Sequence, residues 1–350
     1  MQGSATNYLN RATALFVAAL LLAGGAVCKR DENGNTRPGA RVTLYCSVDE
    51  VFARTVVREF ESKTAIGVDA VFDSEAGKTT GLVNRIVAES QAGEPRADVF
   101  WSSEIFNTIL LARQGLFEPY DSPEAADIPR RFRDSSHRWT ATAVRARVVA
   151  FDLARTDPTQ VPVQWEAFAE ARFAGGVALA NPLFGTTRGH VAAMFATWGP
   201  QRGRAWLTGL RDGGALVMDG NSAAVRAVMN GRAAMALTDS DDVWMARRSG
   251  SNLDMIHPEM GGGGTLLIPC TVALMKGRGR RPEARTLVDF LVSSDVERML
   301  AKSDSRNIPV RADLRAELDV AWPAEATVDF EAVADVMPEA VRAVREILLR

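Results

Sequence analysis

Two long apolar runs decide the fold: AVRARVVAF at residues 143–151 and TLLIPCTVALM at residues 265–275. Each run predicts a β-strand that is longer than its neighbours. Between the two runs, short apolar segments alternate with helical patterns, and this alternation predicts parallel strands covered by helices. A chain that crosses to such a block on one long strand and returns on another forms two lobes joined by a hinge. We therefore expect a two-lobed α/β fold with two hinge-crossing strands.

The same alternation of strands and helices precedes the first long run. The length of the whole chain, 350 residues, also favours two lobes, because single cores stop growing at roughly 250–300 residues. We assign residues 41–143 and 266–315 to the first lobe and residues 144–265 to the second. Residues 316–350 are predicted to form a C-terminal helical extension.

The N-terminus predicts export. Arg11 precedes an apolar run at 12–23 and small residues at 24–26, which is the order of a secretory signal peptide. Cys28 stands where a bacterial lipoprotein is cleaved and acylated; the alternative is that Cys28 is removed with the signal. We predict a signal peptide at 1–28, a flexible polar linker at 29–40, and a periplasmic or extracellular protein that lipid at Cys28 can tether.

Composition and motifs exclude several classes of function. A net charge of -2, with scattered arginines, lacks the basic face that nucleic-acid binding needs. The sequence contains neither HExxH nor GxSxG, and its three histidines lie far apart. We expect a monomer that is not an enzyme and has no cofactor. Cys46 and Cys270 are predicted to be buried thiols, with a disulfide as the alternative.

Polar, oxygen-rich residues follow the predicted strands directly. In open α/β sheets, ligands bind beyond the carboxyl ends of the strands, so these junctions form a candidate site. Helix capping accounts for some of the same residues, because Ser, Thr, Asp and Asn are common N-caps. The predicted ligand-binding residues are Ser47, Asp49, Glu75, Ser103, Glu104, Thr186, Thr187, Asn221, Asp241 and Asp242.

Several segments resemble a known family. They are VTLYCSVDE at 42–50, FESKTAIGVDAVFDSEAGKTTGLVNRI at 60–86, ADVFWSSE at 97–104, QGLFEPY at 114–120, RARVVAFD at 145–152, ARFAGGVALANP at 171–182 and SDSRNIPVR at 303–311. Together they resemble the iron-binding and related solute receptors of ABC importers, which have the type II periplasmic binding fold. The resemblance implies an exported receptor that carries ferric iron and docks on an ABC permease in the inner membrane.

The resemblance is incomplete at the positions that hold the metal. Family members that bind ferric iron use a histidine after the first strand, an acid after the ADVF-type strand and two adjacent tyrosines. Here those positions correspond to Asp49, to Ser103 with Glu104 beside it, and to the pair Asp241 and Asp242. The resemblance therefore implies a metal site of carboxylates, namely Asp49, Glu104, Asp241 and Asp242, which suits hard cations.

Other ligands fit the same residues. Carboxylates also bind an organic ammonium group, and Thr186 and Thr187 at a helix start could bind a phosphate or phosphonate group. A third alternative is an exported hydrolase that uses paired carboxylates, such as a glycosidase. The aromatic content of 7% argues against a sugar-binding cleft.

Overall fold

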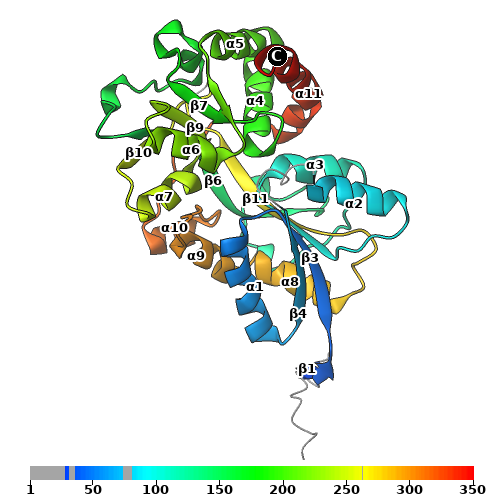
Figure 1. Ribbon diagram of the computed structural model, residues 1–350. Coiled ribbons are helices and arrows are strands. Elements are labelled where there is room, and N and C mark those ends of the chain that lie inside the picture. Colours follow the sequence, from blue (N-terminus) through cyan, green and yellow to red (C-terminus); the bar gives the residue numbers. More distant parts are fainter. Residues whose placement is uncertain (1–27, 31–35, 74–80, 262) are drawn as a thin grey trace, which may run out of the picture.

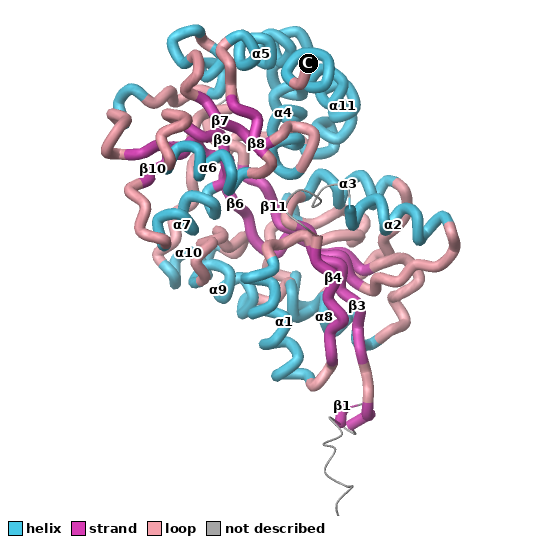
Figure 2. The backbone as a smooth tube through the Cα atoms, viewed as in Figure 1, coloured by secondary structure: helices cyan, strands magenta, loops and turns pink. Residues whose placement is uncertain are grey.

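The computed structural model describes residues 28–30, 36–73, 81–261 and 263–350. The described chain forms two lobes of mixed α/β structure (Figure 1). The strands of both lobes belong to one curved sheet, with the order β4-β3-β5-β11-β6-β9-β7-β8 and with β10 paired to β6 (Figure 2). The α/β class predicted from the sequence is confirmed.

Each lobe contains a parallel core of strands. In the first lobe, β3 (Arg41–Cys46) pairs in parallel with both β4 (Gly67–Phe72) and β5 (Val99–Ser102). In the second lobe, β7 (Val177–Ala180) pairs in parallel with β8 (Leu216–Met218) and β9 (Met235–Asp239). The edge strand β10 (Leu253–Ile256) is antiparallel to its neighbour. In the described part of the chain, helices are the next regular elements after β3, β5, β7, β8 and β9, as the sequence predicts.

Two long strands join the lobes. The first residues of β6 (Thr140–Asp152) pair with β11 (Leu267–Leu274), in a ladder that runs from Thr140 to Ala146. From Arg147 onward, β6 pairs with β9 of the second lobe instead. Strand β11 pairs on its other side with β5 of the first lobe. The two predicted hinge-crossing strands are therefore confirmed, and β6 changes partner between Ala146 and Arg147 (Figure 1).

Amphipathic helices cover the sheet because their apolar residues recur at helical spacing. In α1, for example, Ala53, Val56, Val57 and Phe60 are buried. The helices are α1 (Glu50–Thr64), α2 (Gly81–Gln91), α3 (Ile105–Arg113), α4 (Gly185–Trp198), α5 (Pro200–Asp212), α6 (Asn221–Met229), α7 (Ser240–Arg248), α8 (Pro282–Leu291), α9 (Ser294–Lys302), α10 (Ala312–Leu318) and α11 (Phe330–Ala343).

The C-terminal segment is helical and closely packed. Helix α11 lies along α4 in the second lobe (Figure 1). It continues into a π-helix at Val344–Leu348, and its residues Val333, Ala334 and Met337 are buried. It also reaches α3 of the first lobe, where Arg113 forms ion pairs with Glu331 and Asp335. The extension is therefore an integral part of the apolar core.

Of the segment predicted as a flexible linker at 29–40, the structure describes residues 29–30 and 36–40, and its flexibility stays a prediction. The structure pairs β1 (Cys28–Arg30) with β2 (Thr36–Pro38) as an antiparallel ribbon. The ladder satisfies backbone groups that a flexible tether would leave to water. The predicted signal residues 1–27 lie outside the described part of the chain.

Two further observations concern the cysteine thiols and membrane-spanning helices. Cys46 and Cys270 are both buried and neither forms a disulfide, as favoured from the sequence. Across the described ranges, no helix is both long enough and apolar enough to span a membrane.

Candidate functional site

A cleft with a volume of about 70 Å³ lies between the lobes, at the carboxyl ends of the strands. The first lobe contributes residues that follow β3 and β5, and the second lobe contributes the starts of α4, α6 and α7. Arg145 of β6 also lines the cleft. The full lining is Asp49, Ser103, Glu104, Arg145, Ala180, Asn181, Phe184, Gly185, Thr186, Thr187, Asp219, Gly220, Asn221 and Asp242.

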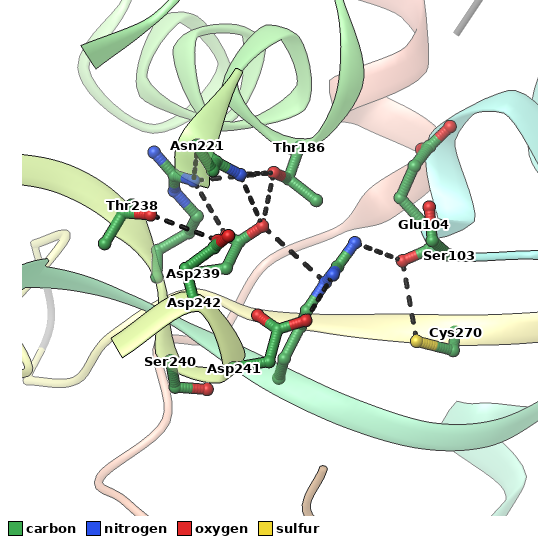
Figure 3. A network of polar contacts seen from close by, with 12 residues as sticks. Ser103, Glu104, Thr186, Asn221, Thr238, Asp239, Ser240, Asp241, Asp242 and Cys270 are labelled. Atoms are coloured by element: carbon green, nitrogen blue, oxygen red, sulfur yellow. Dashed lines mark hydrogen bonds and ion pairs between the residues drawn. The ribbon is translucent and has the colours of Figure 1, made fainter. Parts of the chain in front are cut away.

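Asp239, the last residue of β9, organises the polar network beneath the cleft (Figure 3). Its Oδ1 accepts a hydrogen bond from Arg147 Nη1 at 2.7 Å. Its Oδ2 accepts from Thr186 Oγ1 at 2.6 Å and from Asn221 Nδ2 at 2.8 Å. Both oxygens of this fully buried carboxylate are thus engaged by the protein itself. Arg147 and Arg145 hold the pKa of Asp239 below its usual value, although burial acts in the opposite direction.

Two arginines of β6 stand at the point where the strand changes lobes. Arg145 and Arg147 lie two residues apart, so both side chains project from the same face of the strand. Arg147 is fully buried and also contacts Nδ1 of His190 at 3.3 Å. Burial, together with the charge of Arg147, lowers the pKa of His190 well below its ordinary value. His190 is therefore neutral and structural.

Asp241 is held by the second arginine. Its Oδ2 accepts from Arg145 Nη1 at 2.6 Å, and Nη2 of the same guanidinium donates to the carbonyl oxygen of Ser103 at 2.9 Å. Arg145 therefore links the start of α7 to the first lobe. The other oxygen, Asp241 Oδ1, is buried and has no hydrogen-bond partner among the residues that the structure describes.

Asp242 is the acid of this group that lines the cleft, and it is half-buried. Its two oxygens accept from Ser222 Oγ at 3.0 Å and from Thr238 Oγ1 at 3.1 Å. Burial first, and then the negative charges of Asp241 and Asp239, raise the pKa of Asp242 to about 7. Carboxylate oxygens of Asp239, Asp241 and Asp242 lie within 4.8 Å of one another, a spacing that could hold a metal ion.

The first-lobe wall is built from residues at helix starts. Asp49 is the N-cap residue of α1, although its side chain makes no capping hydrogen bond. Ser47 Oγ accepts from the backbone N–H of Ser103 at 3.0 Å, which joins the ends of β3 and β5. Glu104 caps α3, because its carboxylate accepts from the backbone N–H groups of Phe106 at 2.6 Å and Asn107 at 3.1 Å.

A helix N-terminus opens on the opposite wall. Helix α4 begins at Gly185 without a side-chain cap, and Gly185, Thr186 and Thr187 all line the cleft. Thr187 Oγ1 lies 3.3 Å from Asn221 Oδ1, so the helix start is tied to α6. The positive end of this helix dipole favours a negatively charged group.

The structure brings together most of the residues predicted from the sequence. Seven of them line the cleft: Asp49, Ser103, Glu104, Thr186, Thr187, Asn221 and Asp242. Ser47 and Asp241 lie directly behind the lining, and Glu75 falls outside the described residues. Their role in binding stays a prediction. Among the predicted metal ligands, Glu104 and Asp241 already have protein partners, namely the α3 backbone and Arg145.

The sequence did not predict the charged residues that pair with one another beneath the cleft. Asp239, Arg145 and Arg147 were not among the candidates, yet they form ion pairs at the base of the cleft. A signal was present, since two arginines at alternate positions of an apolar strand need buried acids as partners.

Comparisons with known proteins agree with this architecture. A family model described as "Bacterial extracellular solute-binding protein" matches residues 94–331. The major ferric iron-binding protein of Neisseria meningitidis is 25% identical over 271 residues, which cover 75% of this chain and 78% of that protein. The ferric binding protein from Campylobacter jejuni superposes with a TM-score of 0.77 at 22% identity, covering 87% of this chain and 99% of that one.

A structural neighbour with a different ligand fits equally well. The periplasmic binding protein AfuA from Actinobacillus pleuropneumoniae, with fructose-6-phosphate bound, has a TM-score of 0.75 at 19% identity. The alignment covers 89% of this chain and 99% of that protein.

Proposed function

The chain belongs to the family of bacterial extracellular solute-binding proteins, and on this premise we propose that it is the extracytoplasmic receptor of an ABC importer. We propose further that its cargo is ferric iron or another hard metal cation, which carboxylates hold in the interlobe cleft. The related protein of Neisseria meningitidis is named a ferric iron-binding protein, which supports this assignment.

The observation that carries the cargo proposal is the charge of the cleft lining. Four carboxylates, those of Asp49, Glu104, Asp219 and Asp242, line the cleft together with one guanidinium, that of Arg145. Carboxylate oxygens are the ligands that hard cations prefer. In addition, the buried Oδ1 atom of Asp241 lacks a donor among the described residues, and a cation would satisfy it. The excess of negative charge therefore favours a positively charged cargo.

Capture is proposed to work by closure of the two lobes. Strands β6 and β11 cross between them and act as the hinge. A ligand that contacts both walls stabilises the closed form by its differential affinity for that form. The closed, loaded receptor then delivers its cargo to the permease, and no chemical step is required of it.

A second cargo class has its own support. The start of α4 and the Arg145 side chain both lie at the cleft, and a helix N-terminus and a guanidinium favour an anionic group such as phosphate or phosphonate. The structural neighbour AfuA holds a sugar phosphate in the same fold. An organic ligand that carries an ammonium group as well would also use the acids.

Native purification followed by elemental analysis and mass spectrometry distinguishes these cargoes. We expect about one iron or other hard metal ion per chain. A stoichiometric organic phosphate, phosphonate or ammonium compound without metal would replace the first cargo class by the second. In the same preparation, small-angle scattering should give a smaller radius of gyration with cargo than without it. An unchanged radius at saturation would contradict closure.

The cellular placement is also proposed here. We infer export by the signal segment at 1–28, cleaved before Cys28 so that this cysteine carries the lipid, and a monomeric receptor with lobe boundaries near residues 143 and 265. Fractionation of cells that express the parent and the Cys28→Ser variant tests the tether. Release of the variant, but not of the parent, from the membrane fraction is the expected result. Equal release of both would show that Cys28 carries no lipid.

A further inference from the structure

Arg188 joins the two walls of the cleft at one edge. It belongs to the first turn of α4 in the second lobe, directly after the cleft residues Thr186 and Thr187. Its Nη2 donates to Asn107 Oδ1, on α3 of the first lobe, at 2.5 Å. Its Nε is buried and has no acceptor among the described residues. The hydrogen bond of Arg188 to Asn107 is therefore a contact between the two lobes.

Glu104, a cleft residue of the first lobe, lies within the electrostatic influence of Arg188. Glu104 is 3% exposed, and its carboxylate is directed to the backbone N–H groups at the start of α3. Burial raises the pKa of Glu104, and the positive charge of Arg188 is the largest influence that opposes this shift. The acid, the start of α3 and Arg188 therefore form one electrostatic unit.

The helices that carry these groups meet locally, at Phe106 and Gly189. A Cβ atom at Gly189 would lie 2.0 Å from Cε2 of Phe106, so the ring of Phe106 fills the space above the glycine. On its other side, Phe106 packs edge-on against Phe330 of α11, with the ring centroids 5.8 Å apart. Arg188 thus stands beside a seam of close interlobe packing, where a small displacement of α3 would separate it from Asn107.

We propose that Arg188 is a positioning residue for cargo capture, which clamps the start of α3 against α4 and thereby places Ser103 and Glu104 on the wall of the closed cleft. The inference rests on the proposed receptor function, because it assigns Arg188 to closure around cargo. Arg188 is absent from the cleft lining itself. Its substitution should therefore act through the position of the lobes.

The first test measures the lobes without any cargo. Spin labels at Thr55→Cys on α1 and Gln201→Cys on α5, both exposed sites, report the distance between lobes in a Cys28→Ser background. We expect Arg188→Gln to shift the distance distribution toward longer values. Arg202→Gln is the matched control, because Arg202 pairs with Glu166 inside the second lobe. Identical distributions for Arg188→Gln and the parent would overturn the proposal.

The second test measures cargo release with ferric citrate as the probe. Arg188→Gln should raise the dissociation rate at least tenfold with little change in the association rate, and Arg188→Lys should restore part of the loss. A variant that lowers the melting temperature but leaves both the distance and the rate unchanged would show a merely structural role and overturn the proposal. If Arg188→Gln fails to fold, Asn107→Ala removes the acceptor and must give the same shifts. Failure of iron to bind at all contradicts the cargo assignment, while the spin-label result still decides the role of Arg188.

Discussion

The base of the cleft and its lining contain the same residue types but in different electrostatic states. At the base, Asp239 is matched by Arg147 and by two neutral donors, and all of these groups are supplied by the protein. The lining contains four carboxylates and one guanidinium, that of Arg145, whose ion pairs are to Asp241 and Asp239 rather than to the lining acids. A buried acid that is fully paired contributes to the fold, whereas an acid without a matched cation is available to a ligand. The number of acids at strand ends therefore overstates the number that bind cargo.

The largest effect is expected at the base. Asp239→Ala leaves Arg147 buried without its counter-charge, and breaking a buried pair in this way costs about 3–5 kcal/mol. Chemical denaturation followed by circular dichroism measures the free energy of unfolding. Asp212→Ala is the control, because Asp212 is exposed and forms a surface ion pair with its neighbour Arg211. A loss below about 1 kcal/mol in Asp239→Ala, the value of a surface pair, would mean that the base does not depend on this ion pair.

The next effect is expected on binding. Asp242→Asn should weaken cargo binding by about 2–4 kcal/mol, because a charged ligand in a closed site loses its partner. Its stability should be unchanged or slightly higher, since burial and two neighbouring acids disfavour the Asp242 charge. Isothermal calorimetry on the natively identified cargo, together with thermal unfolding, separates the two quantities. Parent-like affinity in the variant would exclude Asp242 from the site.

Asp241 is intermediate between the paired acids at the base of the cleft and the acids of its lining. Asp241→Asn removes the partner of Arg145, so we expect a loss of stability as well as a loss of affinity of about 2–4 kcal/mol. Calorimetry and denaturation on the same preparation give both values. If the variant loses affinity but keeps the parent's stability, Asp241 belongs with the lining; if it loses stability alone, it belongs with the base.

The sequence predicted the strands and helices well because their signals are local. The long runs at 143–151 and 265–275 became β6 and β11, since apolar strands of that length have no other way to be buried. Polar residues after the strands lay at the cleft because the carboxyl ends of parallel strands share one edge of the sheet.

Which acids pair within the protein and which line the cleft could not be predicted in the same way. Asp239 and Asp242 are three residues apart, one at the end of β9 and the other in the first turn of α7. What separates them is contact with Arg147, which is 92 positions away from Asp239 in the chain. The role of Glu104 was ambiguous for a related reason, because a helix cap and a metal ligand are both carboxylates after a strand. Only the three-dimensional partners decide between the two.

A smaller effect is expected from pH. The pKa of Asp242 is raised to about 7, so this acid holds a proton in the folded protein at pH values where the unfolded chain has lost it. In the ligand-free protein, this group's contribution to stability therefore falls as pH rises from about 4 to about 7. Cation binding has the opposite trend, because a proton competes with the metal.

We expect affinity for a metal cation to fall by up to about tenfold per pH unit below 7, and Asp242→Asn to remove this component. Calorimetry at four pH values between 5 and 8 measures the slope for both proteins. The same slope in parent and variant would assign the titration to another group. An affinity that rises toward low pH would instead favour an anionic cargo.

The smallest expected effect concerns visible absorption: the iron-loaded protein should lack the charge-transfer band of an iron–tyrosinate site. The visible colour of an iron–tyrosinate site is a charge transfer that needs a phenolate oxygen on the metal. Of the three tyrosines in the sequence, Tyr8 lies outside the described residues, in the predicted signal peptide. Tyr45 donates its hydroxyl hydrogen to Glu89 at 2.7 Å, and Tyr120 donates to Asp289 at 2.9 Å. Burial and these carboxylates raise the pKa of each hydroxyl to about 12, which disfavours a phenolate.

Neither Tyr45 nor Tyr120 lines the cleft. Protein loaded with ferric iron should therefore show only weak carboxylate–iron absorption in the visible, and Tyr45→Phe should leave the spectrum unchanged. Absorption spectra of the parent and of Tyr45→Phe at equal iron content measure this directly. A strong visible band that Tyr45→Phe abolishes would place a phenolate on the metal, and the division between a paired base and an acidic lining would then no longer describe the metal site.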